Sequence, residues 1–175
     1  MQYDAIDDSP AGKWDLRYMD LARRVASWSK DPSTKVGAVL VSPLNGVLAT
    51  GFNGFPHLVN DTDARMTDRD EKLRFTIHAE HNVVLWATRH GAPVSGSTIY
   101  VTRPPCAHCA AALVQAGVKR VIADMPPGDF IARWAKDMRA AAEMFAEAGV
   151  ANYWLGETDR LRRVERIALP VANEQ

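Results

Sequence analysis

Apolar and polar positions divide this chain into short helical and strand-like segments that alternate. In the helical segments apolar residues recur every three or four positions, as they do between Asp15 and Ser29. In the strand-like segments β-branched residues cluster in short runs, as they do near the Asn45-Gly46 turn. The pattern predicts helices over 15–29, 78–90, 106–116, 130–148 and 157–169, and strands over 36–42, 47–52, 98–102, 119–123 and 150–155.

This alternation predicts an α/β fold with three layers, α/β/α, in which helices cover both faces of one sheet. The chain has 175 residues without a repeat or a linker, and we expect a single domain over 1–175. Two segments lack a clear period. We expect residues 1–13 to form a flexible arm, and residues 54–76, which are polar and charged, to form a surface excursion with a short helix near 63–73.

Composition narrows the class of function. Lysine and arginine together number 21, as do aspartate and glutamate, so the net charge is zero and we expect no binding to nucleic acid. The N-terminal segment is acidic and lacks the apolar core of a signal sequence, and the longest aliphatic run, 36–41, is too short to cross a bilayer. We therefore expect a cytoplasmic protein without a membrane partner.

The two cysteines of the chain, Cys106 and Cys109, form one C-x-x-C motif. In a chain without a signal sequence this spacing indicates metal or redox chemistry rather than a disulfide framework. Because a helix is predicted to begin at the motif, both sulfurs can face one point, and the partial positive charge of the helix N-terminus favours thiolates. A closed structural zinc site needs four ligands, and the chain has no second cysteine pair.

A second motif, His78-Ala79-Glu80, adds one imidazole and one carboxylate at the start of another predicted helix. Zinc held by His78, Cys106 and Cys109 would keep its fourth tetrahedral position open, which distinguishes a catalytic zinc from a structural one. Glu80 is then free to act as a general acid and base. This combination of H-x-E with P-C-x-x-C is typical of zinc-dependent deaminases.

On these motifs the chain resembles the cytidine and deoxycytidylate deaminase superfamily, and most closely its deoxycytidylate (dCMP) branch. The resemblance extends over 14–155. Its matching segments are SKDPSTKVGAVLV (29–41), GFNGFP (51–56), IHAEHNVV (77–84), TIYVTRPPCAHCAAALVQAGVKRVI (98–122) and MFAEAGV (144–150). It implies a cytidine deaminase-like fold with a mixed five-stranded sheet, Zn²⁺ bound by His78, Cys106 and Cys109, and Glu80 as the catalytic proton shuttle.

The same resemblance implies a reaction and partners. The reaction is the hydrolysis of dCMP to dUMP with release of ammonia, a step of pyrimidine nucleotide metabolism. The partners are the small nucleotide substrate, further copies of the chain in a dimer or hexamer, and dCTP or dTTP as effectors.

Four residues are candidates for binding the substrate. Asn53 lies in G-F-N-G, where the resemblance implies contact with the sugar, although an asparagine there also suits a turn. Ala79 lies between the metal ligand and the proton shuttle, and His57 closely follows Asn53. Arg103 precedes Pro-Pro-Cys, where relatives more often carry a small or neutral residue, and its partner is either the substrate phosphate or a neighbouring subunit.

Two alternatives stay open at this point. One keeps the zinc chemistry but changes the substrate to cytidine, guanine or a tRNA adenosine. The balanced charge disfavours the tRNA version. The other is a non-catalytic nucleotide sensor that keeps zinc for stability, and the intact Glu80 disfavours it.

Overall fold

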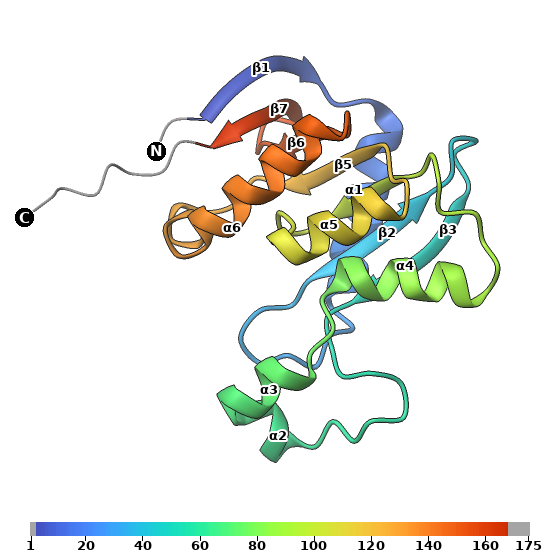
Figure 1. Ribbon diagram of the computed structural model, residues 1–175, viewed down its shortest axis with the longest axis vertical. Helices are drawn as coiled ribbons and strands as arrows, with labels where there is room; N and C mark the ends of the chain where they lie inside the picture. Colours follow the sequence, from blue (N-terminus) through green and yellow to red (C-terminus); the bar gives the residue numbers. More distant parts are fainter. Residues whose placement is uncertain (1–2, 168–175) are drawn as a thin grey trace, which may run out of the picture.

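A computed structural model describes residues 3–167 as one mixed sheet with helices on both faces (Figure 1). The helices are α1 (Lys13–Ala26), α2 (Asp63–Thr67), α3 (Arg69–Phe75), α4 (Ala79–Arg89), α5 (Ala107–Gln115) and α6 (Gly128–Glu147). The strands are β1 (Tyr3–Pro10), β2 (Gly37–Val41), β3 (Val47–Phe52), β4 (Thr98–Val101), β5 (Arg120–Asp124), β6 (Ala151–Leu155) and β7 (Arg160–Ile167).

The predicted α/β/α arrangement is confirmed. Helix α1 covers one face of the sheet, and α4, α5 and α6 lie on the other (Figure 1). Within the described range the sheet has the order β1-β7-β6-β5-β4-β2-β3, with β4, β5 and β6 parallel and the other pairs antiparallel. It therefore has seven strands where five were expected, because β1 and β7 extend it at one edge.

Side chains of the central strands are buried on both faces, which is why these strands are rich in apolar residues. On β2, Leu40 belongs to the core beneath α4–α6, while its neighbour Val39 belongs to the core beneath α1. The close approach of α4 depends on Gly51 of β3, where an added Cβ would lie 2.6 Å from the backbone nitrogen of Val83. This contact places the start of α4 at the sheet.

The helix predicted over 157–169 is wrong. Residues Arg160–Ile167 form β7, which pairs antiparallel with both β6 and β1, and residues 168–169 lie outside the described range. Leu161 and Val164 share one face of a helix, but they face opposite sides of a strand. Both are buried, since helices cover both sides of this sheet.

The expectation of a flexible arm over 1–13 is also wrong for most of that segment. Tyr3–Pro10 form β1 and pair with β7, and α1 begins at Lys13. The strand that pairs with β1 is β7, which was predicted to be helical. Without that strand, the predicted sheet had no neighbour with which this segment could pair.

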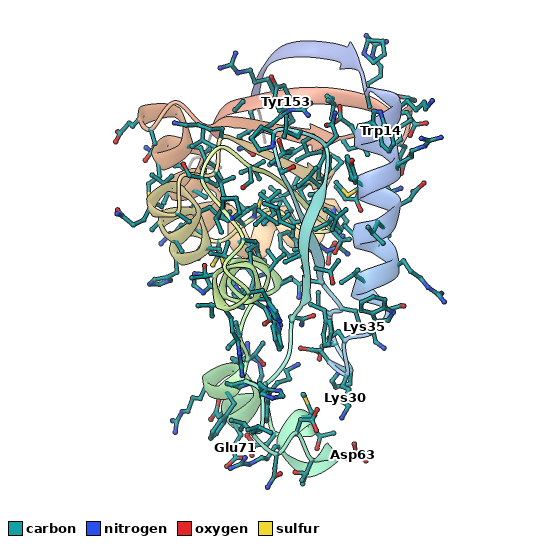
Figure 2. All side chains as sticks on the ribbon, turned by 90° about the vertical axis from the view of Figure 1, so that its right-hand side faces the viewer. Trp14, Lys30, Lys35, Asp63, Glu71 and Tyr153 are labelled. Carbon is teal, nitrogen blue, oxygen red and sulfur yellow. The ribbon has the colours of Figure 1, made fainter. Side chains whose placement is uncertain are left out.

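Residues 54–76 leave the sheet as predicted and carry two short helices, α2 and α3, beyond one end of it. Figure 2 shows this excursion, which bears Asp63 and Glu71, next to the segment that bears Lys30. An ion pair of 2.8 Å joins Lys30 to Asp61 across this boundary. Among the described helices, none combines the length and the apolar character that a membrane crossing requires.

Candidate active site

The predicted metal ligands come from the N-termini of two helices on the same face of the sheet. His78 is the N-cap of α4 and Cys106 is the N-cap of α5, both with extended backbone, and Cys109 lies in the first turn of α5. Pro104 and Pro105 lead the chain into α5 after β4 ends. Since α4 and α5 pack against each other, the three side chains meet.

The spacing of the three ligand atoms fits zinc. The Nδ1 of His78 lies 3.5 Å from the Sγ of Cys106 and 3.4 Å from the Sγ of Cys109, and all the candidate ligand atoms lie within 4.8 Å of one another. Tetrahedral bonds of about 2.3 Å to sulfur and about 2.0 Å to nitrogen would separate sulfur from nitrogen by about 3.5 Å. The donor set and its geometry are therefore those of a zinc site with three protein ligands.

Glu80 reaches the same place because His78 is not helical. With φ −68° and ψ 153° at His78, the chain enters α4 from an extended conformation, so the usual divergence of positions two apart does not apply. Glu80 is only 4 % exposed, and this burial raises the pKa of its carboxyl group to about 7. Both residues line one cavity.

The two thiols and the imidazole of the site shift one another's pKa values. A hydrogen bond with Cys109 lowers the pKa of Cys106 to about 3, and the same hydrogen bond raises the pKa of Cys109. The pKa of His78 is raised by its hydrogen bond with Cys106. A lowered pKa at Cys106 favours the thiolate, which is the form of cysteine that binds zinc.

Three of the four predicted substrate residues line this cavity, which has a volume of about 210 Å³. They are Asn53, Ala79 and Arg103. The structure does not bring His57 to it. The ring of His57 packs instead at 6.0 Å from that of Trp86, over a separate hollow between β3 and α4.

The amide of Asn53 is already engaged with the protein. Its Nδ2 donates to the backbone oxygen of Thr34 at 2.9 Å and to Oδ2 of Asp31 at 3.4 Å, and its Oδ1 accepts from the backbone nitrogen of Val36 at 2.8 Å. Asn53 therefore ties the end of β3 to the segment that precedes β2, which the sequence did not predict.

The wall of the cavity contains residues that sequence analysis missed. Lys72 was part of a charge run expected to be solvated, yet its Nζ lies 3.1 Å from Oδ1 of Asp31 and both side chains are buried. Phe130, Arg133 and Trp134 enter from α6. An acidic residue before Pro-Ser is a turn signal that could have indicated Asp31, but nothing local identifies Lys72, whose partner lies 41 residues away.

Comparisons with known proteins agree with this site. Residues 12–125 match the family model described as the cytidine and deoxycytidylate deaminase zinc-binding region. An uncharacterized deaminase from Aliivibrio fischeri is 42% identical over 143 residues, covering 82% of this chain and 94% of its own. The deoxycytidylate deaminase of Mus musculus is 36% identical over 115 residues, which span 63% of this chain and 64% of the mouse protein.

A solved structure shares the fold. It is the dCMP deaminase of the cyanophage S-TIM5 in its apo form, with a TM-score of 0.63 and 25% sequence identity over 80% of this chain and 95% of the phage chain. The family model matches well over half of the residues and includes His78, Glu80 and both cysteines. This chain therefore belongs to the cytidine and deoxycytidylate deaminase family, whose zinc-binding region it carries.

Proposed function

We propose that this protein hydrolyses dCMP to dUMP. The bond between C4 of the cytosine ring and its exocyclic nitrogen breaks, a bond from C4 to the oxygen of water forms, and ammonia leaves. The observation that carries this proposal is the buried carboxyl group of Glu80 in the cavity formed by His78, Cys106 and their neighbours. Two relatives named as deoxycytidylate or dCMP deaminases, from mouse and from the cyanophage, support the choice of substrate.

The residues of the two motifs divide into metal ligands and one proton carrier. His78, Cys106 and Cys109 would hold zinc, which when bound lowers the pKa of a coordinated water from about 15.7 to roughly 7. Glu80 takes a proton from the attacking water and delivers it to the ring nitrogen beside C4. It then takes the second proton of that water from the oxygen now bonded to C4 and passes it to the departing amine, so that the leaving group is ammonia. Burial keeps this carboxyl group away from bulk water, which limits proton exchange with solvent.

Ala79 and Asn53 are proposed as substrate contacts. Both line the cavity, and the small side chain of Ala79, at the first position of α4, leaves room for a ring beside the metal ligands. The Oδ1 of Asn53 accepts one described hydrogen bond and has a second lone pair for a sugar hydroxyl. A cytoplasmic location remains a prediction from the sequence, and assembly into a dimer or hexamer and regulation by dCTP or dTTP remain predictions from family resemblance.

The test is a substrate panel on the zinc-loaded protein, with ammonia release as the readout. The panel contains dCMP, deoxycytidine, cytidine, guanine and a tRNA anticodon stem. We expect the highest kcat/KM for dCMP. A much higher kcat/KM for another amine would overturn the choice of substrate. If nothing is turned over while dCTP or dTTP raises the melting temperature, the protein is a nucleotide sensor.

A further inference from the structure

Arg103 stands out among the cations of the cavity because no acidic group in the described part of the chain neutralises it. The cavity is lined by Lys72, Arg103 and Arg133. Lys72 is paired with Asp31 and Arg133 with Asp129, each at 3.1 Å. Arg103 forms no ion pair with any side chain that the structure describes, residues 10–164, and one of its terminal nitrogens donates to the backbone oxygen of Thr102 at 3.1 Å.

Hydrogen bonds and two prolines fix the backbone on either side of Arg103, and this determines where its side chain begins. Thr102 exchanges two hydrogen bonds with Gly37 at the start of β2: its nitrogen donates to the Gly37 oxygen at 3.0 Å and its Oγ1 accepts from the Gly37 nitrogen at 3.1 Å. The two residues that follow Arg103 are buried prolines, which restrict the backbone before the cysteine motif. Arg103 therefore leaves the chain at the rim of the metal-binding cavity.

The guanidinium group retains unused donors. Its Nε is buried and has no hydrogen-bond partner in the described residues, and its Cζ lies 5.7 Å from the centre of the Phe130 ring. A guanidinium carries five N–H donors, and buried donors in proteins are almost always paired. The contact with Phe130 does not satisfy Nε, which the surrounding protein encloses. The donors left for a ligand in the cavity are those of the two terminal nitrogens, of which the described hydrogen bonds use one, to the backbone oxygen of Thr102.

A phosphate group suits a cation with free hydrogen-bond donors better than a neutral ligand does, because it supplies both negative charge and acceptor oxygens. Guanidinium groups bind phosphate oxygens in pairs through a planar fork of donors. We propose that Arg103 binds the 5′-phosphate of the nucleotide and so makes the enzyme prefer nucleotides over nucleosides. This inference rests on the proposed deaminase function, and it names the group that determines specificity at that site.

The test compares dCMP with deoxycytidine, which differ only in the phosphate. For Arg103→Gln we expect kcat/KM for dCMP to fall about 10- to 100-fold, mainly through KM, while kcat/KM for deoxycytidine stays within about twofold. Arg103→Lys, which keeps the charge but not the fork, should recover part of the preference. Arg103→Leu provides a second variant that preserves packing against Phe130, and circular dichroism verifies folding.

Binding of the product gives a readout that is independent of turnover. By calorimetry, Arg103→Gln should weaken binding of dUMP about 10- to 100-fold and leave binding of deoxyuridine unchanged. Arg139→Ala is the matched control, because Arg139 is an exposed residue of α6 that pairs with Glu143 and does not line the cavity. It should change none of these values.

The outcomes separate this inference from the proposed function. If the wild-type protein turns over neither dCMP nor deoxycytidine, the proposed function fails. If the wild type turns over dCMP but Arg103→Gln lowers kcat/KM for dCMP and for deoxycytidine by the same factor, the role of Arg103 in phosphate binding is wrong. The same conclusion follows if the wild type shows no preference for dCMP over deoxycytidine. Asp137 also lines the cavity and could pair with Arg103. If Asp137→Asn loses the preference for dCMP over deoxycytidine to the same extent as Arg103→Gln, the partner of Arg103 is Asp137 and the proposed phosphate contact is wrong.

Discussion

At the scale of single residues, the site depends on the conformation of one backbone unit. His78 and Glu80 are two positions apart, a spacing that separates side chains within a helix. The extended backbone at His78 removes this conflict, because only Glu80 lies inside α4. One residue can then face the metal position while the other lines the floor of the same cavity.

The role of Glu80 can be tested without removing the metal. Glu80→Gln preserves the shape of the side chain but cannot transfer protons, so we expect kcat for dCMP to fall about 10²- to 10⁴-fold. Zinc content should stay near that of the wild type, since Glu80 is not among the three candidate ligands. Steady-state kinetics and metal analysis of the same sample measure both quantities.

His108→Ala serves as the control for this variant. His108 lies between the two cysteines but is exposed and is not part of the candidate ligand group, so both zinc and activity should persist. Full activity in zinc-loaded Glu80→Gln would remove the proposed proton shuttle.

At the scale of elements, one wall of the cavity is a hydrogen-bonded loop between α1 and β2. Ser29 donates through Oγ to the backbone oxygen of Asn53 at 2.8 Å, and Oδ1 of Asp31 accepts from the backbone nitrogens of Ser33 and Thr34. Lys72 of α3 completes the set through its ion pair with Asp31. The excursion of residues 54–76 is thereby attached to the cavity wall.

Removing the Asn53 amide should loosen this wall. Asn53→Ala loses three hydrogen bonds of a buried amide, so we expect the free energy of unfolding to fall by about 1–3 kcal/mol. KM for dCMP should rise as well, because the family resemblance implies that Asn53 contacts the sugar of the substrate. Urea denaturation, followed by kinetics, measures both effects.

Asn60→Ala is the matched control, because Asn60 is exposed and only its backbone oxygen makes a described hydrogen bond. An unchanged urea midpoint in Asn53→Ala would show that the loop does not depend on this amide.

At the scale of the whole molecule, a buried carboxylate joins α1 to the sheet. Oδ1 of Asp15 accepts from the hydroxyl of Tyr100 on β4 and from Arg120 on β5, each at 2.7 Å. Burial acts to raise the pKa of Asp15, but the hydrogen bonds from Arg120 and Tyr100 outweigh it, and the net pKa lies below its ordinary value. Asp15 therefore stabilises the fold more when it is ionised than when it is protonated.

This linkage predicts a loss of stability in acid. A carboxyl group whose pKa is lower in the folded state contributes its full stabilisation above its unfolded pKa, about 3.9, and loses it as the pH falls toward the folded pKa. Asp15→Asn should lower the free energy of unfolding by about 1–3 kcal/mol at neutral pH, and this difference from the wild type should shrink below about pH 4. Urea titrations of both proteins between pH 3 and pH 7 measure the difference. A difference that is independent of pH would show that the charge of Asp15 has no part in it.

The sequence by itself identified the candidate metal ligands, the proposed proton shuttle and most of the helices and central strands. These features are local: the spacing of Cys106 and Cys109 and the motif at His78 specify chemistry within a few residues, and the helical and strand periods extend over single elements. The convergence of the two motifs on one point, which spacing alone leaves open, followed from the packing of α4 against α5.

Only the tertiary structure decided which other polar residues surround the site. It paired Lys72 with Asp31, left Arg103 without a described acidic partner, and placed His57 over a different hollow. It also made a strand of β7, whose Leu161 and Val164 are buried on opposite sides of the sheet. Each of these results depends on contacts between residues far apart in the chain, and local sequence patterns carry no information about such pairs because burial and pairing are settled when the layers pack.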